Sequence, residues 1–169
     1  IKGFRFDVID MVSKEWDRLA MSNGPRLHDY IRELNAASFG GKGIITVGET
    51  WGADLAHMQR YSNHDGSEFS MVFNFEHLGL GSDKWSSRFD PLAFKRAMAR
   101  HQQGLHGRGW NSLFLNNHDL PRAVSRFGDD RPEWRETSAK LWAMVLHMMQ
   151  GTPFIYQGEE LAMTNRHWQ

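Results

Sequence analysis

Short β-branched or aromatic runs alternate with helical segments along this chain, and the alternation constrains the fold more than any other feature. The strand candidates are residues 3–9, 44–47, 70–76, 112–115 and 153–156. The helix candidates, which carry apolar residues at helical spacing, are residues 25–34, 53–61, 90–103 and 135–150. Strands separated by helices pair in parallel through right-handed crossovers. The sequence therefore predicts an α/β fold with a parallel sheet.

The first strand candidate, residues 3–9, carries two charges among aromatic and β-branched residues, which predict a buried strand. Arg5 and Asp7 lie two positions apart and therefore on the same face of a strand. Charged groups inside an apolar strand cost several kcal/mol unless they are paired or used. The pair is therefore either a buried structural ion pair or part of a functional site.

Carboxylates recur at the C-terminal ends of the predicted strands, and this favours the functional interpretation. They are Asp7, Glu49, Glu76, Asp119 and Glu159. The C-terminal ends of parallel strands meet on one face, where α/β barrels place their active sites. We therefore expect the acids to gather at one rim of the sheet.

Two of these acids have the spacing that a retaining glycosidase needs. Such an enzyme uses one carboxylate as nucleophile and a second carboxyl group as proton donor, about 5 Å apart. Asp7 and Glu49 lie one strand–helix–strand unit apart, so they should end neighbouring strands about 4.8 Å apart. Asp119 would face the same sugar from the other side, and Arg5 would keep Asp7 ionised and oriented.

Composition excludes several other classes of partner. The chain has twenty acidic and twenty basic residues, so no net field favours nucleic acid or an anionic membrane. It has no cysteine, no membrane-length apolar run, no histidine spacing typical of a zinc site and no phosphate-binding glycine loop. Seven tryptophans and eleven phenylalanines hint at carbohydrate. We expect a small oligosaccharide substrate, no nucleic acid or membrane partner, no cofactor or metal, and a cytoplasmic location.

Four ordered segments resemble the signatures of the α-amylase superfamily, glycoside hydrolase family 13, most closely its oligo-1,6-glucosidase and dextran glucosidase branch. They read GFRFDVI, TVGETW, FLNNHDLPR and GTPFIYQGEEL. The resemblance implies Asp7 as nucleophile, Glu49 as acid/base and Asp119 as transition-state stabiliser. It also implies that Arg5 and His118 bind around the same sugar ring.

The resemblance further implies that residues 1–169 are the C-terminal part of a catalytic (β/α)8 TIM barrel, covering approximately its strands 4 to 8. Strands 1 to 3, an inserted domain and a C-terminal β domain would then be absent, and any structural calcium site would lie in the missing part. We expect this segment by itself neither to fold stably nor to hydrolyse sugar, because its opening strand would expose an edge.

Further positions have two interpretations each. Val8 resembles the valine that accompanies α-1,6 preference in this branch, or is an ordinary strand residue. Trp51 lines the leaving-group side in the resembling enzymes, or is core. Glu76 helps hold the acceptor sugar, or forms a surface salt bridge. Arg122 reaches substrate hydroxyls, or anchors its loop to a backbone carbonyl.

Two other features are expected to be structural. Glu159 and Glu160 are adjacent, so they point apart on a strand and should stabilise their loop. The methionines of the 135–150 helix, Met144, Met148 and Met149, are expected to pack in the core.

The predicted function is that of a retaining α-glucosidase acting on terminal α-1,6 bonds of isomalto-oligosaccharides. Trehalose-6-phosphate hydrolase, α-1,4-glucosidase and sucrose isomerase are alternatives within the family. A non-catalytic barrel scaffold is the alternative from another class, and the presence of all three acids argues against it. The sequence departs from the family's frequent residues at Leu120, where glutamine is common, and at Asp10, where asparagine is frequent.

Overall fold

The computed structural model describes residues 1–79 and 89–166. The chain divides into two compact units. The first unit comprises Ile1–Phe75 and Ala99–Ser112, and the second comprises Glu76–Met98 and Leu113–Gln169. Each unit has its own hydrophobic core. Among the described residues, no helix is long and apolar enough to cross a membrane.

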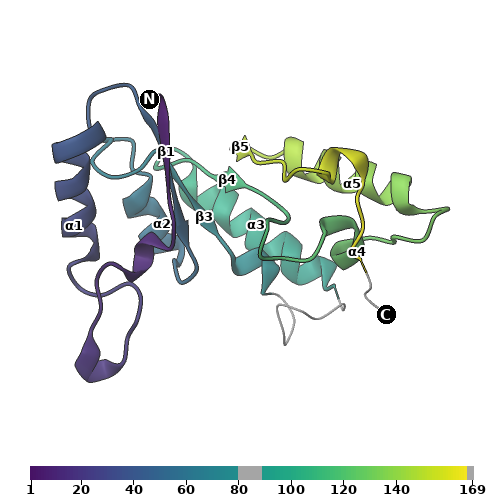
Figure 1. The fold of residues 1–169 in the computed structure, drawn as a ribbon, viewed down its shortest axis with the longest axis horizontal. Coiled ribbons are helices and arrows are strands. Elements are labelled where there is room, and N and C mark those ends of the chain that lie inside the picture. The colour runs from purple at the N-terminus through teal and green to yellow at the C-terminus, as the bar shows by residue number, and fades with distance from the viewer. Residues whose placement is uncertain (80–88, 167–169) are drawn as a thin grey trace. The chain divides into compact units, whose positions relative to one another are not determined.

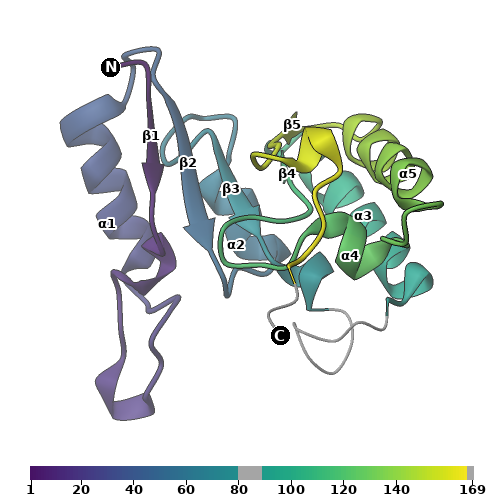
Figure 2. The same cartoon turned by 45° about the vertical axis from the view of Figure 1, so that its right-hand side comes forward.

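The first unit is built on a parallel sheet with strand order β1-β2-β3, which is seen in Figure 2. Figure 1 labels β1 and β3 of the same sheet. Its strands are β1 (Gly3–Phe6), β2 (Ile45–Thr50) and β3 (Met71–Asn74). β1 pairs with β2 in a register that places Gly3 beside Ile45 and Phe6 beside Gly48. The predicted parallel pairing of the segments that carry Asp7 and Glu49 is therefore confirmed.

The two faces of this sheet differ because side chains alternate along each strand. Helices α1 (Leu27–Leu34) and α2 (Leu55–Tyr61) contribute to the core together with the last residue of helix α3 (Pro91–Leu105). Val72 belongs to that core, and Phe6 packs against it. In the register, Phe6, Gly48 and Val72 are neighbours. Arg5, Val47 and Glu49 have the opposite parity, so they lie on the face turned away from this core.

The opening strand differs from the prediction in length and in burial. It ends at Phe6, and its residues are exposed or half-buried, so the predicted buried strand through Ile9 is wrong. The backbone turns because Val8 has a φ of 37° and begins the 3-10 helix η1 (Ile9–Met11). The strand is exposed because, in the described sheet, β1 is an edge strand with a partner on one side only. The predicted exposed edge is therefore present.

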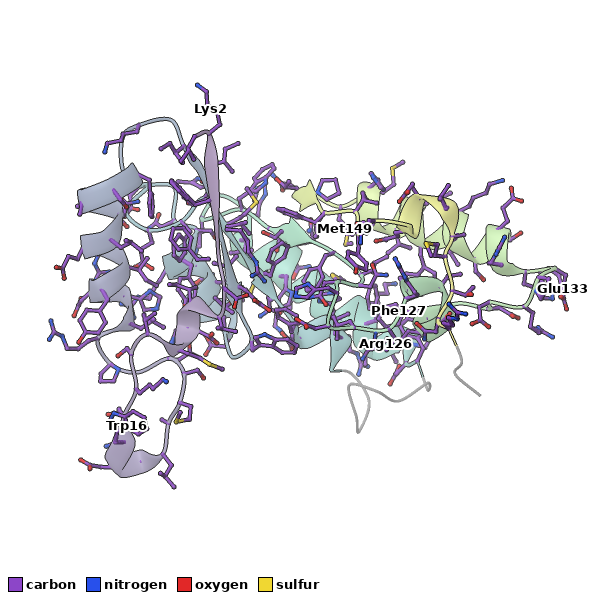
Figure 3. The ribbon with its side chains drawn as sticks, viewed as in Figure 1. Lys2, Trp16, Arg126, Phe127, Glu133 and Met149 are labelled. Atoms are coloured by element: carbon purple, nitrogen blue, oxygen red, sulfur yellow. The ribbon has the colours of Figure 1, made fainter. Side chains whose placement is uncertain are left out.

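The loop after β1 carries the 3-10 helix η2 (Trp16–Arg18). Trp16 lies at the end of this loop that is farthest from the sheet, and 67% of its surface is exposed (Figure 3). The following helix begins at Leu27, not at Pro25, and continues as the π-helical turn η3 (Asn35–Phe39). Leu27 and Ile31 are the residues through which α1 packs into the core, and they have the helical spacing predicted from the sequence.

The second unit packs helices around Trp142. These helices are the first half of α3, α4 (Ala123–Phe127) and α5 (Arg135–His147). The short strands are β4 (Ser112–Leu113), which begins at the boundary of the unit, and β5 (Thr152–Pro153). The unit also contains the 3-10 helices η4 (Glu76–Leu78) and η5 (Glu159–Leu161). Trp142 meets Phe94 and Phe127 at ring-centroid distances of 5.4 and 5.3 Å. The predicted start of α3 is confirmed, since Asp90 accepts hydrogen bonds from the amides of Leu92 and Ala93.

Helix α5 differs from the prediction in two respects. It ends at His147 and has 13 residues, whereas the predicted helix ran from 135 to 150 and was longer than α3, which has 15 residues. The expectation that its methionines are core is wrong for Met144 and Met148, which are 58% and 81% exposed. Met149 does pack against the core of the second unit. The apolar residues of α5 are distributed around its whole circumference, but only the face that carries Trp142 and Leu146 packs against the core.

Candidate active site

One arginine joins two of the predicted catalytic acids. The guanidinium of Arg5 donates from Nη1 to Oδ1 of Asp7, and from Nη2 to Oε2 of Glu49 at 2.5 Å. The strand register explains the meeting, because Phe6 lies beside Gly48 and the next positions along both strands are Asp7 and Glu49. One guanidinium and two hydrogen bonds span about 8 Å at most, so the two carboxylates lie within the range of separations that glycosidases use.

The two carboxylates lie in different surroundings. The Asp7 side chain is 71% exposed, whereas that of Glu49 is 3% exposed. Glu49 is held from both sides: Oε1 accepts a hydrogen bond from Trp51 Nε1 at 2.9 Å, and Oε2 is also 3.4 Å from the amide nitrogen of Val8. The Asp7 carboxylate is therefore open to solvent, whereas the Glu49 carboxylate is buried and held by its hydrogen-bond partners.

The backbone at Val8 shapes the turn that follows Asp7. Its φ of 37° and ψ of 46° lie in the left-handed region, where a β-branched residue is an outlier. Such a conformation costs of order 1–3 kcal/mol and persists only where the surrounding structure enforces it. Here it ends β1 at Phe6 and directs the Val8 amide toward Glu49. No residue pattern indicates this strain, because valine normally favours the extended strand conformation.

Trp51 belongs to the site by contact. Besides its hydrogen bond to Glu49, its ring stacks on Phe75 with centroids 3.9 Å apart and planes 13° apart. Sequence reasoning left Trp51 open between cleft and core, and it did not identify Phe75 at all. The only available signal was the aromatic directly after Asn74, at the end of the third predicted strand. The structure shows Phe75 as the surface on which the indole rests.

The second unit carries the third predicted acid, Asp119, in the loop after β4. Its Oδ2 lies 3.3 Å from Nε2 of His118, and the two side chains are 49% and 62% exposed. The Asp119 amide donates to Oδ1 of Asn117 at 2.9 Å, which fixes the turn. The predicted transition-state stabiliser, Asp119, and the predicted sugar-binding residue His118 thus lie side by side and open to solvent.

Arg122 and Glu76 lie in the same unit. Arg122 donates from Nη1 to the carbonyl of Gln157 at 2.5 Å, and its guanidinium lies 4.7 Å from the centroid of the Tyr156 ring. These contacts support the loop-anchoring interpretation of Arg122 over substrate contact. Glu76 begins η4 and is half-buried. Its two predicted roles, holding the acceptor sugar and forming a surface salt bridge, stay predictions.

The adjacent acids Glu159 and Glu160 stabilise their loop. Oε2 of Glu159 accepts from the Tyr156 amide at 3.2 Å, and Oε2 of Glu160 accepts from the Gly158 amide at 2.8 Å. Burial raises the pKa of the Glu159 carboxyl above its ordinary value. Both contacts are internal to the loop, as the sequence analysis expected.

Among residues 1–79 and 89–166, no group of three or more His, Cys, Asp or Glu side chains is placed to hold a metal ion.

A parallel sheet that presents two carboxylates at the ends of neighbouring strands has the pair of acidic groups that glycoside hydrolases use. The alpha-amylase catalytic domain family matches residues 1–169 of this chain. The chain belongs to this family, glycoside hydrolase family 13.

Individual relatives agree with this assignment. The chain is 52% identical to a glucan 1,6-alpha-glucosidase of Streptococcus pneumoniae, over 98% of the chain and 32% of that protein. The trehalose-6-phosphate hydrolase structure of Bacillus licheniformis matches with a TM-score of 0.88 and 43% identity, over 98% of the chain and 32% of the neighbour. An isomaltulose synthase mutant of Erwinia rhapontici, solved with sucrose, matches with a TM-score of 0.89 and 35% identity, over 98% of the chain and 32% of the neighbour. The chain thus spans about a third of the length of these proteins. The solved neighbours are TIM-barrel enzymes.

Proposed function

We propose that the protein carrying this chain is a retaining α-glucosidase that hydrolyses terminal α-1,6 bonds of isomalto-oligosaccharides. The observation that carries the proposal is the bridge from Arg5 to both Asp7 and Glu49 at the ends of β1 and β2. The proposal includes the place of the five strands as approximately the fourth to eighth of a (β/α)8 barrel.

The chemistry follows from the two environments. Asp7 attacks the anomeric carbon and forms a glycosyl ester, while the bond to the leaving oxygen breaks and Glu49 gives that oxygen its proton. Glu49 then takes a proton from water, whose oxygen bonds to the anomeric carbon as the ester to Asp7 breaks. Two inversions give the α anomer. Asp119 and His118 contact the sugar during these steps, and Asp119 favours the positively charged transition state.

The α-1,6 preference is supported by the glucan 1,6-alpha-glucosidase relative and by Val8, directly after the nucleophile. Trehalose-6-phosphate hydrolysis is the second candidate, because a solved hydrolase of that name matches nearly the whole chain. Sucrose isomerisation is a third, because the matching isomaltulose synthase was solved with sucrose. A valine in place of a smaller or polar residue at position 8 changes the transition-state free energy of one substrate relative to another by about 1 to 3 kcal/mol at most. The candidate substrates therefore have to be compared directly.

The deciding experiment assays the full-length gene product on isomaltose, maltose, trehalose 6-phosphate and sucrose, with Asp7→Asn beside it. Wild type should prefer isomaltose and release α-glucose first, observed by proton NMR before mutarotation. Asp7→Asn should lose at least about a thousandfold in kcat. Asp29→Asn, on the exposed side of α1, is the matched control and should keep full rate. An Asp7→Asn variant with wild-type turnover, or release of β-glucose, would refute the assignment.

A further inference from the structure

Three hydrogen bonds close a ring between the loop after β1 and the loop after β2. The backbone amide of Asn23 donates to the backbone carbonyl of Asp10 at 2.8 Å, and the side-chain Nδ2 of Asn23 donates to the backbone carbonyl of Gly52 at 2.8 Å. The Gly52 amide donates to Asp10 Oδ2 at 3.0 Å. We call these three residues, Asp10, Asn23 and Gly52, the loop clamp. Both backbone polar groups of Gly52 are therefore engaged in it.

The loop clamp leaves no room for a side chain at position 52. A Cβ there would lie 2.8 Å from Asn23 Nδ2 and 3.1 Å from Ser22 Oγ. Asn23 itself has a φ of 55°, which asparagine adopts more readily than most residues. The close approach and the left-handed asparagine both show that the two loops are held at a fixed separation.

The clamp lies next to the group that orients the predicted acid. Gly52 directly follows Trp51, whose indole donates to Glu49 Oε1 at 2.9 Å. The stacking partner of that indole, Phe75, is 6% exposed, so the ring rests on a buried neighbour. A displacement of the peptide at Gly52 therefore moves the backbone of Trp51 and tilts its Nε1 away from Glu49.

Packing alone does not account for Asp10. Asp10 is 0% exposed, and its Oδ1 has no hydrogen-bond partner among the residues that the structure describes. Burying a carboxyl in this way costs free energy that an apolar residue would not. His57 and Tyr61 of α2 are the titratable groups near it. Burial raises the pKa of the Asp10 carboxyl, while the amides of Gly52 and Trp51 and the charge of His57 act in the opposite direction.

We propose that Asp10 is a positioning residue for Glu49, acting through Gly52 and Trp51, so that the loop clamp sets the orientation of the proton donor. The inference rests on the proposed function, in which Glu49 is the acid. Asp10 touches neither substrate nor reacting atoms in this role.

The test uses the dependence of rate on the leaving group. An aryl glucoside with a dinitrophenyl leaving group needs little proton donation, whereas isomaltose needs it fully. A misplaced acid therefore slows kcat/KM for isomaltose far more than kcat/KM for dinitrophenyl α-glucoside. General folding damage lowers both alike. The variants, made in the full-length gene product, are Asp10→Ala, Asp10→Asn and Asn23→Gly, with Glu49→Gln as the reference for a missing acid.

We expect Asp10→Ala and Asn23→Gly to lose at least about tenfold more on isomaltose than on the aryl glucoside, within the range that a general acid contributes. Asn23→Gly keeps the positive φ while deleting the amide, so it decides the matter if Asp10→Ala does not fold. Asp10→Asn retains an oxygen for the Gly52 amide and should restore most of the isomaltose rate.

The outcomes separate the two proposals. Equal losses on both substrates for Asn23→Gly and Asp10→Ala, with a selective loss for Glu49→Gln, would overturn the positioning role alone. Failure of Asp10→Asn to recover the isomaltose rate would also overturn it. Wild-type inactivity on α-glucosides, or a Glu49→Gln variant without selectivity between the substrates, would overturn the proposed function itself.

Discussion

Removing the guanidinium of Arg5 tests the arrangement most directly, because one side chain serves both predicted catalytic acids. Arg5→Gln deletes the positive charge and both donor nitrogens that reach Asp7 and Glu49. Each hydrogen bond to a charged group contributes about 1.5–3 kcal/mol, so the two together contribute about 3–6 kcal/mol. The Arg5 side chain is 39% exposed, and water will replace part of this interaction. We therefore expect the lower half of the range, a loss of about 10² to 10³ in kcat/KM for isomaltose.

Arg5→Lys separates charge from geometry. Lysine keeps the charge but presents a single ammonium group, which cannot donate to both carboxylates in the planar fork of a guanidinium. About one of the two hydrogen bonds is then lost, which predicts a loss of roughly 10- to 100-fold. The order of kcat/KM should be wild type, then Arg5→Lys, then Arg5→Gln.

The assay is steady-state hydrolysis of isomaltose by the full-length gene product, with thermal melting of each variant measured alongside. Arg18→Gln is the matched control, because the Arg18 side chain is 80% exposed and lies 3.7 Å from its partner Glu15. It should be indistinguishable from wild type. An Arg5→Gln variant within about threefold of wild type would refute the idea that this bridge organises the two acids.

Three further predictions concern other parts of the chain. Trp51→Phe keeps the stack on Phe75 but deletes the donor to Glu49, so kcat/KM for isomaltose should fall about 10- to 100-fold with little change in melting temperature, and an unchanged rate would contradict the contact. His101 is 4% exposed, and burial, with a smaller contribution from Arg100, lowers its pKa from 6.5 to about 4. The unfolded chain therefore binds a proton at His101 more readily than the folded chain does, so about 3 kcal/mol of the free energy of unfolding is present above pH 6.5 and is lost as the pH falls toward 4. His101→Gln should flatten the dependence of the free energy of unfolding on pH in this range, and an unchanged dependence would contradict the prediction. Asp90→Ala removes the acceptor for two amides at the start of α3 and should cost about 1 kcal/mol in denaturant unfolding, whereas Asp90→Asn should cost less.

The sequence predicted the features that follow from local pattern. Alternating apolar residues and turn signals placed β2, β3 and α2, and Asp90 with Pro91 marked the start of α3. The spacing between Asp7 and Glu49 predicted neighbouring parallel strands, and the register confirms it. The motif resemblance named the family.

The remaining features depend on tertiary context, which residue patterns do not encode. Val8 adopts a left-handed conformation against its own propensity, and this shortened β1. The apolar residues surrounding α5 suggested burial, but only one face of that helix meets the core, which leaves Met144 and Met148 exposed. Asn23 and Phe75 have no motif of their own. Their contacts to Gly52 and Trp51 arise only when separate loops fold together.

The sharing of Arg5 has a consequence for how charge is distributed during turnover. In the resting state of the proposed cycle, Asp7 is the anion and Glu49 holds the proton; in the glycosyl ester, Asp7 is neutral and Glu49 has become the anion. A guanidinium in contact with both therefore remains opposite a single negative charge before and after the first chemical step. The cation stays fixed while the anion alternates between β1 and β2, so neither half of the reaction requires a new counter-ion to be recruited.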